Sequence, residues 1–133
     1  MTDRRHDGTA GAWHVGNAVA DGANTRGWIL GHFLDETCGV RSTTAVEVKW
    51  AHHTAGTRRS TIVTGETRTT LLLLIEGRYR LDVSQGSALL TEPGDYVLWG
   101  PGVDHQWSAE HDSTIVTVRW PSVPTDAEGL PRG

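Results

Sequence analysis

The sequence lacks the features of secreted, membrane-spanning and thiolate-rich zinc proteins. Cys38 is the one cysteine in 133 residues, which excludes an internal disulfide and a metal site built from several thiolates. No run of eighteen apolar residues occurs, and the first residues hold no apolar segment typical of a signal peptide. The sequence therefore predicts a protein that neither spans a membrane nor is exported, and we expect it in the cytoplasm.

Positive charge is also scarce. Twelve arginine and lysine residues stand against sixteen aspartate and glutamate residues, the formal net charge is −4, and Lys49 is the one lysine. A chain of this charge offers no broad positive field to the phosphates of a nucleic acid or to anionic lipid. Nucleic acids and membranes are therefore not expected as partners, and a small molecule is.

Glycine, by contrast, is abundant. The 16 glycines indicate many tight turns and short elements, and no stretch shows the apolar period of an amphipathic helix. Eight short segments bounded by turn residues are expected to be strands: residues 28–34, 45–51, 68–76, 78–83, 88–92, 96–100, 105–110 and 113–120. This pattern predicts an all-β sandwich or barrel, and the length allows one domain.

The two ends of the chain differ from this central region. Residues 1–25 are polar, rich in glycine, alanine and aspartate, and without a sustained period, so they predict a flexible arm. Residues 122–133 are rich in proline and glycine and predict a disordered tail. The β domain is expected to cover residues 26–121.

Two of the expected strands resemble each other. Residues 46–50 read VEVKW and residues 116–120 read VTVRW, so valine and tryptophan alternate with polar residues in both. In a half-exposed sheet the polar face meets water. In a barrel with a ligand-filled interior, the same face, with Glu47, Lys49 and Arg119, lines the cavity. The sequence does not decide between the two, because a shift of one residue exchanges the faces.

Residues 94–105, GDYVLWGPGVDH, resemble the second conserved motif of the cupin family: a Gly-Asp pair, a short apolar strand, a turn with proline and glycine, and a histidine three residues after that glycine. Residues 53–57, HTAGT, and 71–81, LLLLIEGRYRL, resemble the two ends of the first cupin motif. The resemblance implies a single-domain cupin-type β-barrel, also called a double-stranded β-helix or jelly roll. It also implies a site for a small molecule inside the barrel and a homodimer.

The histidine of the second motif is expected to face the barrel interior. Trp107 lies two residues after His105 and so shares its face of the strand, which pairs an imidazole with a flat apolar surface. Such a pairing is typical of a pocket for a small organic molecule. We assign Trp107 to substrate binding, together with His52, Thr70 and Arg119, whose guanidinium offers a carboxylate two parallel donors.

Metal-binding cupins supply a His-X-His pair and a glutamate from the first motif and a histidine from the second. Here His53 and His105 match two of the four ligands, while an alanine and a threonine occupy the other positions. If one divalent ion is bound, whether Fe, Ni, Mn, Cu or Zn, we expect His53, His105 and Glu47 to hold it, with His52 as a further candidate. The sequence leaves open whether a metal is bound at all.

Without a metal, the same residues predict acid-base catalysis. Glu47, Lys49 and His53 share one face of a strand, so an inward orientation brings them together with His105. Such groups can abstract and return protons in a partly dry barrel. The favoured function is therefore a proton-transfer enzyme of specialised metabolism that isomerises, cyclises, dehydrates or epimerises its substrate. A metal-dependent oxygenase and a non-catalytic binding or sensing module are the alternatives.

Overall fold

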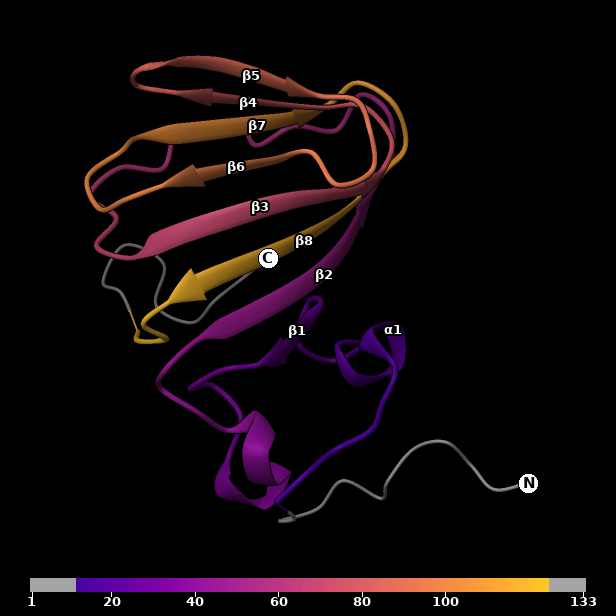
Figure 1. Ribbon diagram of the computed structural model, residues 1–133, viewed down its shortest axis with the longest axis vertical. Coiled ribbons are helices and arrows are strands. Elements are labelled where there is room, and N and C mark those ends of the chain that lie inside the picture. Colours follow the sequence, from indigo (N-terminus) through magenta and orange to yellow (C-terminus); the bar gives the residue numbers. More distant parts are fainter. Residues whose placement is uncertain (1–11, 125–133) are drawn as a thin grey trace.

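The computed structural model of the protein describes residues 12–124, so parts of the predicted arm and tail, residues 1–11 and 125–133, lie outside the described residues. Figure 1 shows two short helical segments and eight strands. In chain order they are α1 (Ala18–Asp21), β1 (Trp28–Leu30), the 3₁₀ helix η1 (Glu36–Arg41), β2 (Glu47–His53), β3 (Thr69–Glu76), β4 (Tyr79–Val83), β5 (Gly86–Leu90), β6 (Tyr96–Trp99), β7 (His105–Ala109) and β8 (Ser113–Trp120).

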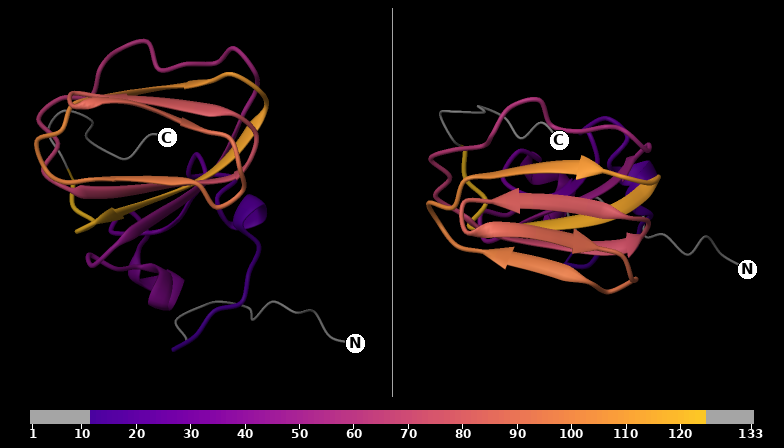
Figure 2. Two further views of the ribbon diagram at one scale, coloured as in Figure 1. Left: turned by 45° about the horizontal axis from the view of Figure 1, so that its top comes forward. Right: turned by 90° about the horizontal axis from the view of Figure 1, so that it is seen from above.

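The strands form two antiparallel sheets. The five-stranded sheet has the order β1-β2-β8-β3-β6, and the three-stranded sheet has the order β5-β4-β7. The two sheets face each other as layers, and the chain crosses from one layer to the other at both ends (Figure 2). All eight predicted strands are present, and the predicted all-β fold is confirmed.

One crossing between the sheets depends on a glycine. The turn between β3 and β4 contains Gly77, whose φ of +120° lies in a region that residues with a Cβ rarely adopt. A Cβ at this position would also lie 2.3 Å from Oγ of Ser113. The Glu76-Gly77 pair therefore ends β3 and allows β4 to start in the other sheet.

The predicted strand over residues 28–34 is too long. β1 ends at Leu30, and the side chain of Asp35 then accepts a hydrogen bond from the backbone N–H of Thr37, which caps η1. Helix α1 begins in the same way at Asn17. Both helical segments are too short to produce an apolar period, which is why the sequence did not reveal them. Neither one, in the part of the chain that the structure covers, is long enough to span a membrane.

The hydrophobic core fills one part of the space between the sheets. Its buried residues come from both sheets: Leu72, Leu74, Tyr79, Leu81, Leu90, Trp99, Ala109 and Ile115. Along β3, the inward side chains of Leu74 and Leu72 belong to this core, whereas the next inward position holds buried Thr70. The interior therefore changes from apolar to polar along the strand.

The strand register settles which face of the five-stranded sheet points inward. Glu47, Arg119, Thr70 and Trp99 are register neighbours across β2, β8, β3 and β6, and we call them the inner row. The outer rows are Val48, Val118, Leu71 and Leu98, and next to them Trp50, Val116, Leu73 and Tyr96. The charged face of the two similar strands thus faces the interior, which is the second of the two orientations that the sequence left open.

Candidate functional site

The polar part of the interior is a pocket of about 300 Å³ between the two sheets. This volume is at the lower end of the range for small-molecule sites. Six of the eight predicted site residues line it: Lys49, His53, Thr70, His105, Trp107 and Arg119. Because β2 and β7 belong to opposite sheets, His53 and His105 enter the pocket from opposite walls.

Three rings form an aromatic wall on one side of the pocket: His53, Tyr79 and Trp107. The ring centre of His53 lies 4.2 Å from that of Trp107 and 5.8 Å from that of Tyr79. Tyr79 and Trp107 stack at 5.5 Å with their planes 18° apart. Because both residues come from the three-stranded sheet, the wall joins that sheet to β2 and gives a planar molecule a surface on which to stack.

Two groups in the pocket lining have strongly shifted pKa values: burial raises the pKa of the Tyr79 hydroxyl, and the pKa of His53 is lowered. The pKa of His53 is lowered from 6.5 to about 4, mainly by burial, with smaller electrostatic contributions from the neighbouring Lys49 and His52. His53 is therefore a neutral imidazole at neutral pH and has a lone pair available for a proton.

His105 is also neutral at neutral pH. Burial lowers its pKa, and the opposing effects of the Val103 carbonyl and of Glu66 do not reverse the shift. Its Nδ1 lies 3.3 Å from the carbonyl oxygen of Val103, and because a carbonyl only accepts, Nδ1 carries the proton in this contact. Nε2 then has the lone pair. The ring centre lies 4.7 Å from that of Trp99, which belongs to the inner row.

Three members of the inner row line the pocket and carry hydrogen-bond donors, and we call Arg119, Thr70 and Trp99 the donor row. They lie on neighbouring strands in direct register. Thr70 is 2% exposed and Trp99 is 6% exposed, yet Oγ1 of Thr70 and Nε1 of Trp99 have no hydrogen-bond partner within residues 12–124. Buried polar atoms are usually paired in folded proteins, so these two atoms mark a place where a ligand can bind.

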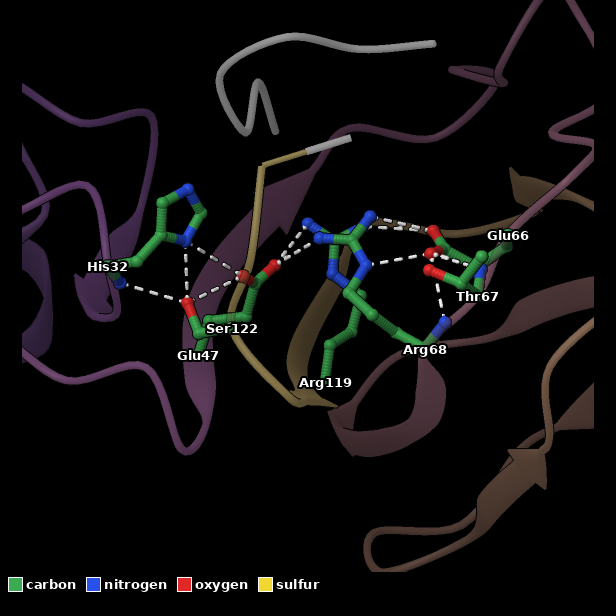
Figure 3. Close-up of polar contacts among 7 residues, drawn as sticks. All are labelled: His32, Glu47, Glu66, Thr67, Arg68, Arg119 and Ser122. Atoms are coloured by element: carbon green, nitrogen blue, oxygen red, sulfur yellow. Dashed lines mark hydrogen bonds and ion pairs between the residues drawn. The ribbon is translucent and has the colours of Figure 1, made fainter. Parts of the chain in front are cut away.

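Arg119 is held in position by a charged cluster, which consists of Glu47, Glu66, Arg68 and Arg119 (Figure 3). Oε2 of Glu47 lies 2.7 Å from Arg119 and 2.8 Å from Arg68. Arg68 also contacts Glu66 at 2.7 Å, and Arg119 lies 3.9 Å from Glu66. Two carboxylates thus balance two guanidinium groups, and the planar guanidinium of Arg119 rests 4.5 Å from the ring centre of Trp28.

Burial disfavours the ionised form of Glu66 in this cluster, but its pairing with arginine side chains outweighs the effect of burial. Burial raises the pKa of Glu66, whereas the hydrogen bonds and the positive charge of Arg68 lower it, and the net effect is a lowered pKa. Glu66 therefore stays ionised at neutral pH. The second oxygen of Glu47, Oε1, accepts a hydrogen bond of 2.8 Å from Ser122, next to which His32 lies (Figure 3).

Two predicted site residues do not reach the pocket. Glu47 faces inward as expected, but it is fully buried and both of its oxygens are used by the charged cluster and Ser122, so it does not line the pocket. His52 lies on the outer face of β2, is exposed, and contacts Thr114 at 3.2 Å. The physical reason is the alternation of the strand, which turns His52 away when His53 points inward.

The residues do not fit a metal site. The predicted set of His53, His105 and Glu47 is not brought together, because the carboxylate of Glu47 is bound to arginine side chains. In the described range, no group of three or more histidine, cysteine, aspartate or glutamate side chains lies close enough to hold a metal ion. First-row metals in proteins generally need three or more such ligands.

Sequence reasoning missed several residues of the pocket: Arg26, Trp28, Arg59, Tyr79 and Trp99. Trp99 could have been found from the alternation of its strand, because Val97 and Trp99 share one face and Tyr96 and Leu98 share the other. The others come from segments whose orientation depends on contacts with strands far away in the sequence. The lining thus contains four basic side chains, from Arg26, Lys49, Arg59 and Arg119. No aspartate or glutamate of the described chain lines the pocket.

Solved structures with a similar fold include KdgF from Halomonas sp., with a TM-score of 0.53 and 19% identity, covering 59% of this chain and 72% of that chain. An RmlC-like cupin from Shewanella frigidimarina gives 0.53 and 17%, covering 59% and 68%, and the protein plu4264 from Photorhabdus luminescens gives 0.51 and 16%, covering 59% and 64%. No family model and no curated protein matches the sequence. At these identities the likeness establishes the fold, and the predicted cupin-type β-barrel is confirmed.

Proposed function

We propose that the protein is an enzyme that moves a proton within a small organic molecule held in the barrel pocket. The reaction class is isomerisation, cyclisation, dehydration or epimerisation. The observation that carries the proposal is His53, an imidazole that is neutral at neutral pH, that lines the pocket, and that lies against the flat surface of Trp107. A positioned imidazole beside a bound planar molecule is a common arrangement for general acid-base catalysis.

In the proposed step, His53 removes a proton from a carbon next to a carbonyl group of the substrate. The C–H bond breaks, its electron pair moves toward the carbonyl oxygen, and the positive charges of Lys49 and Arg119 stabilise the negative charge that develops. Because the pKa of His53 is lowered to about 4, its imidazolium form gives the proton back readily. Return of the proton to another carbon, or to the other face of the same carbon, completes the reaction.

Deuterium exchange tests the proposal with a probe molecule in place of the natural substrate. Phenylpyruvate is a suitable probe, because it is small, has a flat aromatic ring and has acidic methylene protons next to a carbonyl group. In D₂O, proton NMR is expected to show that the protein accelerates the loss of the methylene signal, and that His53→Gln abolishes the acceleration. Arg80→Gln, which changes an exposed residue paired with Asp82, is the control and is expected to leave the rate unchanged. An exchange rate that the protein does not alter, or that His53→Gln does not lower, contradicts the proposal.

A non-catalytic binding module is the second candidate function. It is favoured by the composition of the pocket lining, in which basic and hydrogen-bond-donating side chains outnumber groups that can exchange protons near neutral pH. A ligand that is retained by the protein and recovered chemically unchanged, with no deuterium uptake, would support this candidate over the enzyme. The metal-dependent oxygenase is not carried further, because its predicted ligands lie apart.

We also propose a homodimer, as the cupin resemblance implied, with the outer rows as its interface. These rows present eight apolar side chains across four strands, and Tyr96 and Leu98 are 61% and 55% exposed. Monomeric proteins rarely expose a contiguous apolar area of this extent. Two copies of one sheet face can pack against each other about a two-fold axis, which makes a second copy of the chain the partner that this surface fits.

A further inference from the structure

We propose that the ligand of the pocket is a small planar carboxylate, an unsaturated or aromatic acid, bound with its carboxylate on the donor row and its planar body on the aromatic wall. This inference rests on the proposed function, because both place a small molecule in the same pocket. It assigns the chemical class of the ligand, which the proton-transfer proposal leaves open, and it holds for a binding module as well as for an enzyme.

The negative charge of the ligand follows from the lining. Four basic side chains line the pocket, Arg26, Lys49, Arg59 and Arg119, and no carboxylate of the described chain does. Arg119 is paired within the charged cluster, and the lining as a whole has basic side chains and no carboxylate of the described residues, which gives it a positive character. A positive site inside a pocket attracts an anion more strongly than one on a flat surface, because water screens the charges less.

The place of the anionic group follows from the donor row. Arg119, Thr70 and Trp99 are register neighbours on adjacent strands, which lie about 4.8 Å apart, and each side chain carries a hydrogen-bond donor. Thr70 and Trp99 are more than nine-tenths buried, and their polar atoms have no hydrogen-bond partner among the described residues. A carboxylate has two oxygens with about four acceptor sites, so it can accept hydrogen bonds from more than one of these donors.

The carboxylate is held by a donor whose position is fixed. Glu47 and Glu66 contact Arg119 from the side of the charged cluster, and Trp28 packs against its plane. Figure 3 shows Arg119 and Arg68 between the two glutamates. An arginine fixed in this way loses little conformational freedom when it binds a ligand, which favours affinity. Glu47 and Glu66 are thus positioning residues for the anion site, although they do not line the pocket.

The planar body follows from the other wall. Trp107, Tyr79 and His53 stack on one another at 4.2 to 5.8 Å, and Trp107 and His53 both line the pocket. Aromatic surfaces of this kind bind flat unsaturated groups by offset stacking. The pocket volume of about 300 Å³ limits the ligand to a small molecule.

Isothermal titration calorimetry with matched probes tests the assignment directly. Benzoate and benzamide have the same shape and differ in charge, so benzoate is expected to bind the wild-type protein at least about tenfold more tightly, the ratio typical of hydrogen bonds to a charged group. Acetate has the charge without the ring and is expected to bind more weakly than benzoate. Phenyl phosphate separates a carboxylate site from a phosphate site, and it is expected to bind more weakly than benzoate.

Two variants locate the carboxylate. Thr70→Val keeps the shape of the side chain and removes a donor, and Trp99→Phe removes the indole N–H. Each is expected to lower the affinity for benzoate about five- to tenfold and to leave benzamide nearly unchanged. Thr70→Val is nearly isosteric, so it keeps the test valid if Trp99→Phe fails to fold. Arg80→Gln, on the surface, is the control and is expected to change neither affinity.

Equal affinity for benzoate and benzamide, tighter binding of phenyl phosphate, or no binding of benzoate by the folded wild-type protein at millimolar concentration would each overturn the inference. The result is separable from the test of proton transfer. Benzoate has no acidic C–H, so its binding reports only on the ligand class, whereas deuterium exchange of phenylpyruvate reports on the chemistry once benzoate has been shown to bind. Preferential binding of benzoate without exchange would leave the inference standing and end the enzyme proposal.

Discussion

The inner row of the five-stranded sheet consists of charged and hydrogen-bonding side chains, whereas the outer rows, on the opposite face of the same strands, are entirely apolar. An ordinary half-exposed sheet has the opposite arrangement, with apolar residues inside and polar residues toward water. The inner face of this sheet instead lines a pocket and the outer face is suited to a partner. This difference between the two faces supports the two proposals, a ligand on the inner side and a second copy of the chain on the outer side.

The largest expected effect comes from a substitution in the charged cluster on the inner face. Glu47→Gln removes one charge from the charged cluster and leaves a buried guanidinium without its full compensation, so we expect a loss of about 3 kcal/mol in the free energy of unfolding. Urea denaturation followed by tryptophan fluorescence measures it. Glu76→Gln is the matched control, because Glu76 is an exposed glutamate of the same sheet, and the expected change is about 0.5 kcal/mol or less. Equal changes for the two variants would show that the cluster does not stabilise the fold.

The second largest effect is expected from a substitution in the outer rows. Leu98→Lys places a charge in the apolar surface that we propose as the dimer interface, and an interface residue of this kind contributes about 2 kcal/mol to association. Light scattering is expected to give the mass of two chains for the wild-type protein and of one chain for the variant at micromolar concentration. The control is Arg80→Gln, which lies in the other sheet. A wild-type protein with the mass of one chain contradicts the dimer.

Most of the fold could be predicted from the sequence, because the alternation in segments such as VEVKW and the turn pairs such as Glu76-Gly77 are local signals. The site could be predicted in part. His53, His105, Trp107 and Arg119 follow from strand parity once the inward face is known, but a single register shift reverses that face. The burial of Glu47 could not be predicted, since it depends on Arg68 and Glu66, which are contacts made across the fold.

A third prediction concerns how the free energy of unfolding depends on pH through the buried histidines. Because the pKa of His53 is about 4 in the folded protein and 6.5 is its ordinary value, the unfolded chain binds a proton first as the pH falls. The free energy of unfolding is therefore expected to fall from pH 6.5 to about pH 4. The lowered pKa of His105 and of His32 acts in the same direction.

The measurement is urea denaturation at intervals between pH 4 and pH 7. His53→Leu removes one titrating group, so the slope of unfolding free energy against pH is expected to be smaller than in the wild-type protein within this window. Glu66 also lowers stability at the acid end of this window, because its pKa is lowered from 4.5 and the unfolded chain therefore binds its proton first, but this contribution is common to both proteins and cancels in the comparison. Identical slopes for the two proteins would mean that His53 titrates normally and is exposed to water.

The most direct test of the account is the NMR spectrum of the indole N–H groups, because the tryptophans report on both faces of the sheet. Trp28, Trp99 and Trp107 line the pocket, whereas Trp50 and Trp120 lie on the outer face. When benzoate is added to the ¹⁵N-labelled protein, the indole signals of Trp99 and Trp28 are expected to shift in a saturable way, and those of Trp50 and Trp120 to stay in place. Saturable shifts confined to Trp50 and Trp120, or no shift at Trp99, would contradict the claim that the inner face is the binding site.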